Sequence, residues 1–265
     1  MKRLSFFLFF VFILTRLAAQ EAVNIGTKHL LRSDILGEVR EYWVHLPREY
    51  EVDSSKTFPV LYLLDGDRNF TSLVAIEQAT RKNPFIIVGV LNTDRGRDMT
   101  PTNSLERIKG YHPNSGGADK FYRFLVEELR KSIDATYRTN SENMLHGHSL
   151  CGLFTLYTFL NHTDSFQAYV ALDPSLWWDK EFMMTEFQQR WMQIEGNNRI
   201  LYVAKSGAER NSDNQLKDLI SEFRDEYLSK QPLQGLQNKY EIFENETHGS
   251  LVLPASIEAI KFITE

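Results

Sequence analysis

The sequence predicts an α/β domain in which a mostly parallel central sheet carries helices on both faces. Apolar runs of strand length alternate along the chain with patterns of helical spacing, and this alternation is typical of a parallel sheet. The 265 residues suffice for one sizeable domain, and 42% hydrophobic with 25% charged residues is ordinary for a globular protein. We find no repeat, linker or low-complexity segment in residues 21–265, so we expect them to form one domain.

The first 20 residues have the pattern of a secretory signal peptide. A positive start at Lys2 and Arg3 precedes an apolar stretch, residues 4–14, that is too short to span a bilayer comfortably, and residues 17–20 include small residues suited to cleavage. The alternative is an uncleaved anchor, which Arg16 disfavours. We therefore expect an exported protein, periplasmic or secreted, that has no stable membrane insertion after cleavage. Cys151 is the only cysteine, so no intramolecular disulfide can form.

The strands follow from the apolar runs. Residues 38–46 alternate as a half-buried edge strand does and end at Pro47, whereas four continuous apolar runs predict parallel strands covered on both faces. These runs are 58–64, 84–90, 168–172 and 199–204. Apolar residues at helical spacing predict helices over 119–135 and 212–228, and a strand at 239–243 precedes a last helix at 255–263.

Residues 143–154 predict a short strand, a sharp turn at Ser149 and a helix. This is the layout of a nucleophile elbow, in which a strained turn exposes the serine hydroxyl above the sheet. The turn needs small residues two positions before and after the serine. Gly147 meets this need, but Cys151 stands where glycine is expected and Gly152 comes one residue later. The alternative is a buried serine at an ordinary strand-to-helix turn.

A serine hydroxyl needs a base to take its proton. Two histidines follow Ser149 in the chain: His162, which is better placed to cap a helix C-terminus, and His248, in a polar loop before the last helix. We expect His248 to be the general base; a solvated surface histidine is the alternative. The base needs an acid to hold its second nitrogen, and the loop after the penultimate strand offers Glu209 first and Asp213 second. Asp173, after the strand at 168–172, is the third candidate.

The oxyanion of the tetrahedral intermediate needs at least two N–H donors. One is expected from the backbone of Leu150, the residue after the serine, and the other from Gly66 or Asp67, after the strand ending at Leu64.

Five residues near the strand ends are candidates for binding substrate. Arginine could hold carboxylate, catecholate or phosphate groups, although Arg95 and Arg97 could instead pair with Asp94 and Asp98. The two tryptophans could form an aromatic wall or lie in the core. The five candidates are Arg68, Arg95, Arg97, Trp177 and Trp178.

Several separate segments carry a resemblance to a known family. They are residues 33–40, 62–66, 92–102, 116–121, 147–150, 174–178 and 247–250. Together they resemble the putative esterase family related to esterase D, within the α/β-hydrolases, and in particular its branch of trilactone-siderophore esterases. The resemblance covers nearly all of the mature chain and implies an α/β-hydrolase fold and a serine esterase with no metal and no cofactor. The family pattern reads G-H-S-L-G-G, so Cys151 departs from it, and we expect a packed thiol there.

The resemblance implies a small-molecule ester as substrate, either a siderophore ester or a carbohydrate ester such as a feruloyl or acetyl sugar. An acyltransferase that uses the same acyl-enzyme and a non-catalytic binding module on this scaffold are the alternatives. The net charge of −5 and pI near 5.9 provide no basic field, so we expect no nucleic-acid partner.

Overall fold

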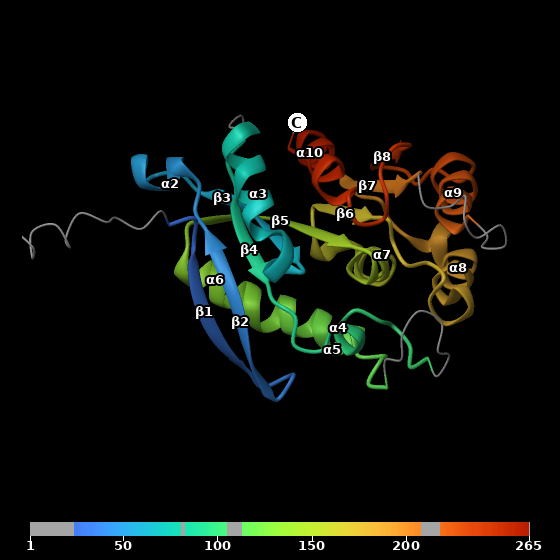
Figure 1. Cartoon of the computed structure of the whole chain (residues 1–265), viewed down its shortest axis with the longest axis horizontal. Helices are drawn as coiled ribbons and strands as arrows, with labels where there is room; N and C mark the ends of the chain where they lie inside the picture. Colours follow the sequence, from blue (N-terminus) through green and yellow to red (C-terminus); the bar gives the residue numbers. More distant parts are fainter. Residues whose placement is uncertain (1–23, 81–82, 105–112, 208–217, 265) are drawn as a thin grey trace, which may run out of the picture.

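A computed structural model describes residues 24–80, 83–104, 113–207 and 218–264. The predicted signal peptide at residues 1–20 lies outside these ranges. Eight strands of the described chain form one sheet in the order β1-β2-β4-β3-β5-β6-β7-β8 (Figure 1). They are β1 (Thr27–Ser33), β2 (Glu38–His45), β3 (Phe58–Leu64), β4 (Ile86–Val90), β5 (Thr139–His148), β6 (Ala168–Leu172), β7 (Arg199–Ser206) and β8 (Leu236–Phe243).

The sheet is mostly parallel, as predicted. Strands β4, β3, β5, β6, β7 and β8 run parallel to one another, while β1 and β2 pair antiparallel at one end. The prediction that residues 38–46 form an edge strand is wrong, because β2 lies between β1 and β4. The edge strand at this end of the sheet is β1. It is largely exposed along its length, so its sequence lacks the apolar periodicity that reveals a strand.

Helices connect the parallel strands. The long predicted helix at 119–135 is continuous in space as α5 (Ala118–Arg123), a π-helical segment η1 (Phe124–Leu129) and α6 (Arg130–Thr136). The described part of the predicted helix at 212–228 comprises α9 (Leu219–Phe223) and η5 (Arg224–Ser229). The others are α2 (Arg48–Val52), α3 (Gly66–Thr80), α4 (Arg95–Asp98), α7 (Leu150–Asn161), η2 (Thr163–Ser165), α8 (Trp178–Arg190), η3 (Trp191–Gln193) and α10 (Val252–Ile263).

Two apolar layers cover the two faces of the sheet. Alternate residues of β3 divide between them, with Tyr62 in one layer and Leu61 and Leu63 in the other. The first layer is built with α5, η1, α7, α8 and α9, and the second with α3 and α10, which pack on each other. Burial on both faces explains why these strands read as continuous apolar runs.

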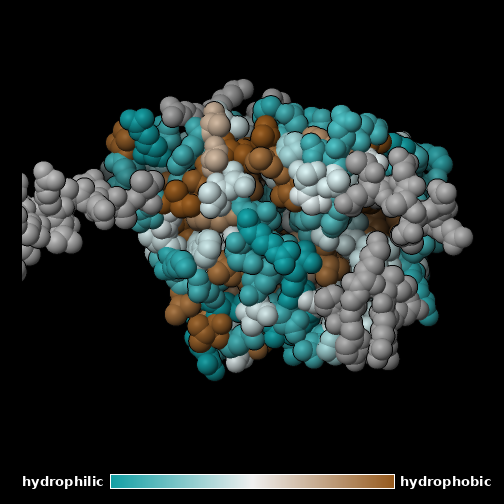
Figure 2. All heavy atoms as spheres, viewed as in Figure 1, coloured by the Kyte–Doolittle hydropathy of each residue, from teal (hydrophilic) through white to brown (hydrophobic). Residues whose placement is uncertain are grey.

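The surface mixes polar and apolar residues (Figure 2). Two of the more exposed apolar side chains, Leu30 and Val39, lie on the antiparallel strands β1 and β2, away from the parallel centre of the sheet. Among the helices of the described residues, none combines the length and apolar character needed to cross a bilayer.

Candidate active site

Three residues with left-handed backbone lie at the ends of three neighbouring strands. Asp65 follows β3 with a φ of 55°, Ser149 follows β5 with 62°, and Asp173 follows β6 with 42°. Because β3, β5 and β6 are parallel neighbours, their carboxyl ends share one edge of the sheet. Such backbone costs a non-glycine residue about 1–3 kcal/mol and is concentrated at functional sites. This edge is therefore the candidate active site.

The predicted strand, turn and helix are present around Ser149. The serine has φ 62° and ψ −119° between β5 and α7, and its N–H donates to the carbonyl of Leu172 at 2.9 Å. A Cβ on Gly147 would lie 2.2 Å from the carbonyl oxygen of Cys151, which no side chain could tolerate. A Cβ on Gly152 would lie 3.1 Å from the carbonyl oxygen of Leu172. The close approaches thus fall on Gly147 and Gly152, so a cysteine is accepted at position 151.

His248 is held on two sides. Its Nδ1 lies 2.7 Å from Asp173 Oδ2, and its backbone carbonyl accepts a hydrogen bond of 2.8 Å from His148 Nε2. The rings of His148 and His248 are 4.5 Å apart between centroids. A carboxylate and a carbonyl can only accept, so His248 carries its hydrogen on Nδ1 and His148 on Nε2. This leaves Nε2 of His248 without a hydrogen and able to accept a proton, on a ring that packs against His148, the residue before Ser149.

The same contacts fix the state of His148. Burial and the neighbouring His248 lower the pKa of His148 to about 4. His148 is therefore neutral near pH 7 and acts as a hydrogen-bond donor to the main chain of His248. The other downstream histidine, His162, closes the C-terminus of α7 as predicted, where it stacks on Tyr122.

The acid that the structure brings to His248 is Asp173, the third candidate of the sequence analysis. Its carboxylate is 6% exposed and also accepts a hydrogen bond of 2.6 Å from Ser206 Oγ. Glu209 and Asp213 lie outside the described residues. Those two acids follow β7 in the chain, but β6 is the direct neighbour of the serine strand, with Leu172 opposite His148 in the register. Asp173 follows that pair immediately.

Ser149 Oγ itself lies 3.3 Å from Ser175 Oγ. Within the described chain no hydrogen bond joins Ser149 to His248. Hydrogen bonds between a catalytic serine and its histidine are often long in free enzymes and shorten when substrate binds.

The candidate oxyanion donors begin two helices. Leu150 is the first residue of α7, and Gly66 and Asp67 are the first two of α3. The N–H groups of a first helical turn have no carbonyl of their own helix to bind, so they are available to an anion. A Cβ on Gly66 would lie 2.6 Å from the carbonyl carbon of Gly89, so glycine lets the start of α3 press against β4.

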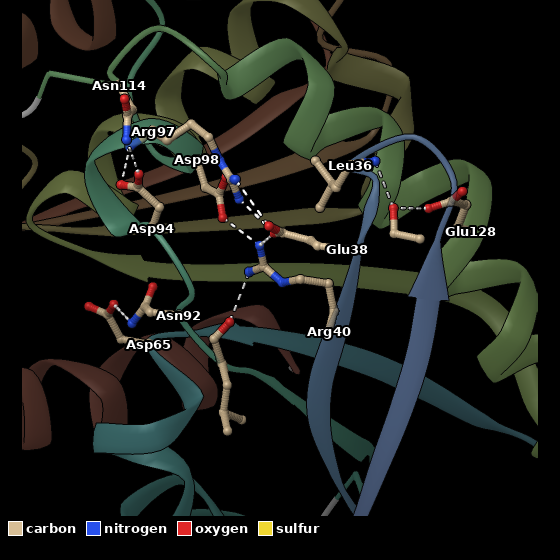
Figure 3. Close-up of polar contacts among 12 residues, drawn as sticks. Leu36, Glu38, Arg40, Asp65, Asn92, Asp94, Arg97, Asp98, Asn114 and Glu128 are labelled. Carbon is tan, nitrogen blue, oxygen red and sulfur yellow. Dashed lines mark hydrogen bonds and ion pairs between the residues drawn. The ribbon is translucent and has the colours of Figure 1, made fainter.

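Arg95 joins Asp65, the residue before the candidate oxyanion donors, to the serine turn. Its Nε and Nη2 donate to the two carboxylate oxygens of Asp65 at 2.8 and 2.9 Å, and Nη2 also donates to the carbonyl of His148 at 3.1 Å. Asn92 adds a 2.7 Å hydrogen bond to Asp65 (Figure 3). Burial alone would raise the pKa of Asp65, but the hydrogen bonds and charge of Arg95 outweigh it, and the pKa lies below its usual value.

Cys151 packs against this ion pair. Its side chain is fully buried, and its thiol lies beside Asp65 and Arg95. Burial and the charge of Asp65 raise the pKa of the thiol well above its usual value. A protonated, buried thiol is a poor nucleophile, which agrees with the expected packing role.

Arg97 belongs to a second group of charges that fixes α4 on β2 (Figure 3). It donates to Glu38 at 2.7 Å and to Asp98 at 2.6 Å. Arg40, which is 1% exposed, donates to Asp98 at 2.6 Å. Both Arg95 and Arg97 are therefore paired with carboxylates, but Arg95 pairs with Asp65 rather than Asp94. The Asp94 side chain instead caps α4 by accepting from the N–H of Arg97.

The remaining substrate-binding candidates differ in exposure. Arg68 is exposed in the first turn of α3, directly after the candidate oxyanion donors Gly66 and Asp67. Trp178 is 4% exposed and donates to Thr102 Oγ1 at 3.2 Å, so it is a core residue, which was the alternative for both tryptophans. Trp177 is half-buried, with its ring 6.1 Å from that of Trp178. Arg68 and Trp177 thus keep surface for a ligand.

The sheet order, the helices on both faces and the serine turn between β5 and α7 define an α/β-hydrolase fold. Solved structures share it. An IroE-like serine hydrolase from Shewanella oneidensis superposes with a TM-score of 0.84 at 31% identity, covering 90% of this chain and 80% of that one. The enterobactin hydrolase IroE in complex with DFP gives a TM-score of 0.67 at 19% identity, covering 92% and 97%.

The family described as "Putative esterase" matches residues 33–211, and the chain belongs to it. The ferri-bacillibactin esterase BesA of Bacillus subtilis (strain 168) is 31% identical over 248 residues, which cover 85% of each chain. A siderophore enterobactin esterase of Emericella nidulans is 26% identical over 256 residues, covering 80% of this chain and 84% of that one. The protein is a carboxylic ester hydrolase.

Proposed function

We propose that the protein is an exported serine esterase that hydrolyses siderophore esters through an acyl-enzyme on Ser149. The observation that carries the mechanism is the fixation of His248 between Asp173 and His148, next to the strained turn at Ser149. The substrate class follows from the relatives, which are named for esters of siderophores. Export rests on the signal-peptide pattern of residues 1–20, and sequencing the N-terminus of the secreted or periplasmic protein would test it.

In the acylation step, Ser149 Oγ attacks the ester carbonyl carbon while its proton passes to Nε2 of His248. The electron pair of the carbonyl moves to its oxygen, which accepts hydrogen bonds from the N–H of Leu150 and that of Gly66 or Asp67. Each such donor contributes on the order of 3 kcal/mol to transition-state stabilisation. The imidazolium of His248 then gives its proton to the leaving alcohol. Water repeats the sequence on the acyl-enzyme and releases the acid.

Asp173 serves as the acid of the triad. Its hydrogen bond to Nδ1 keeps the basic nitrogen of His248 at Nε2 and stabilises the imidazolium that forms during each step. Ser206 donates to the same carboxylate oxygen, which favours the ionised form that this role needs. Glu209, the first choice from the sequence, is the competing acid.

The test measures kcat and KM on an aryl ester and on a ferric trilactone siderophore. We expect Ser149→Ala to abolish turnover and Asp173→Asn to lower kcat by roughly 10³–10⁴-fold, because the wrong histidine tautomer then prevails. Glu209→Gln and Asp213→Asn are matched controls that remove one of the other candidate acids each and should retain wild-type kcat. A large loss in Glu209→Gln with an active Asp173→Asn would transfer the role to Glu209.

Substrate preference is measured separately from the serine mechanism. We expect the kcat/KM for the ferric trilactone to exceed that for feruloyl and acetyl sugars. Turnover of the sugar esters without turnover of the trilactone would refute the siderophore assignment while leaving the serine mechanism intact. Transfer of the acyl group to an added sugar in place of water would identify an acyltransferase.

A further inference from the structure

A second serine hydroxyl lies against the nucleophile. Ser175, in the loop between β6 and α8, places its Oγ 3.3 Å from Ser149 Oγ. Ser175 is 2% exposed. Among the residues that the structure describes, Ser149 Oγ is the only hydrogen-bond partner of this hydroxyl.

The main chain fixes this contact. The N–H of Ser175 donates to the carbonyl of Ser149 at 3.1 Å, and the N–H of Ser149 donates to the carbonyl of Leu172 at 2.9 Å. Pro174, between Asp173 and Ser175, packs on Gly152, whose would-be Cβ lies 3.1 Å from the proline Cα. The hydroxyl of Ser175 is thus held in place by the same loop that presents Asp173 to His248.

Folding alone does not account for this hydroxyl. Burying a hydroxyl costs free energy unless a hydrogen bond compensates, and in the described chain the partner that compensates for Ser175 is Ser149 Oγ rather than a group of its own loop. An alanine would fill nearly the same volume without the cost. The position is explained if the hydroxyl acts on Ser149.

We propose that Ser175 is a further catalytic residue, which donates a hydrogen bond to Ser149 Oγ whenever that oxygen gains negative charge. The proposal rests on the proposed role of Ser149 as nucleophile. By donating to a lone pair of Oγ, Ser175 leaves the hydrogen of Ser149 free to turn to His248. The proton of Ser175 stays on its own oxygen throughout, and Ser149 loses and regains its proton only through His248 Nε2.

The hydrogen bond acts in both halves of the reaction. In acylation, Ser149 Oγ gains negative charge as its proton moves to His248 and the bond to the carbonyl carbon forms. In deacylation, the bond between that carbon and Oγ breaks, and Oγ takes the electron pair before His248 returns the proton. A donor that stabilises this charge lowers both barriers.

The test compares the rate at which a fluorophosphonate modifies Ser149 in the wild type and in Ser175→Ala, together with kcat and KM on an aryl ester. We expect both the modification rate and kcat to fall about tenfold with little change in KM, as for the loss of one hydrogen bond to a developing charge. Ser175→Cys, with a weaker donor, should fall between the two. Thr158→Val is the matched control: it removes a buried hydroxyl from α7 whose one partner among the described residues is the helix carbonyl of Phe154, so its rates should equal the wild type.

Unchanged rates in Ser175→Ala would overturn the proposal, and so would a loss of the same size in Thr158→Val. Faster rates would also overturn it, because Ser175 would then be the acceptor of the Ser149 hydrogen and a competitor of His248. Ser149→Ala distinguishes a failure of the proposed function from a failure of the role of Ser175. If Ser149→Ala retains turnover, the proposed function fails. An inactive Ser149→Ala with a fully active Ser175→Ala refutes the role of Ser175 alone.

Discussion

Replacing Arg95 by methionine should destabilise the protein by an amount that depends on pH. The substitution keeps much of the side-chain volume but leaves the carboxylate of Asp65, 1% exposed, without its ionic partner. Removing one partner of a buried pair costs about 3–5 kcal/mol. Asn92 still donates to Asp65 at 2.7 Å, so we expect the low end, about 3 kcal/mol, for the loss in free energy of unfolding at pH 7.

The pH dependence follows from the opposing causes at Asp65. In the wild type the pKa of Asp65 lies below its usual value, so the carboxylate contributes its full stability above the unfolded pKa of about 3.9 and loses it only in strong acid. Without Arg95, burial dominates and raises the pKa of Asp65 above the unfolded value. The variant then binds a proton more readily when folded, and its deficit relative to the wild type should shrink as the pH falls from 8 to 5.

Urea unfolding of both proteins at pH 8 and pH 5 measures this change. A deficit that stays constant between the two pH values would refute the reasoning, since it would mean that the charge of Asp65 is not the source of the cost. The double variant Asp65→Asn with Arg95→Met should recover part of the stability. Arg123→Met, which breaks a solvent-exposed pair with Glu127, is the control and should leave the urea midpoint almost unchanged.

Three further substitutions test the serine turn. Gly147→Ala should abolish activity and lower the thermal midpoint sharply, because its Cβ would lie 2.2 Å from the backbone carbonyl oxygen of Cys151. Gly152→Ala should be milder, because the nearest atom to its Cβ would be 3.1 Å away. Equal effects of the two variants would contradict the geometry. Cys151→Ala should keep kcat within about twofold, since the buried thiol only packs, and a thiol-alkylating reagent should not inactivate the wild type under native conditions. Inactivation in step with alkylation would instead place the thiol within reach of the reaction.

The local parts of the fold could be predicted from the sequence. Runs such as 58–64 and 168–172 are apolar because their strands are covered on both faces, and the turn at Ser149 has a signature of a few adjacent residues. β1 could not be found in this way, because an edge strand that is exposed along most of its length carries no apolar period.

The partners within the site depend on which strands become neighbours. The sequence does not show that β6 pairs with β5. This pairing brings Asp173 to His248, which is 75 residues further along the chain. The pairing of Arg95 with Asp65 likewise depends on the position of α4 beside the end of β3. The ion pair between Arg40 on β2 and Asp98 on α4 secures this position. A search for acids near Arg95 in the chain finds Asp94, whose side chain is already used to cap α4.

The double attachment of His248 also has a consequence for the order of folding. Its loop follows β8, and its two hydrogen bonds reach Asp173 and His148, which are 75 and 100 residues earlier in the chain. Contacts between such distant segments carry a large loop-closure cost and form late, after local helices and hairpins. Recovery of esterase activity during refolding should therefore report the docking of the last strand and helix rather than the collapse of the sheet.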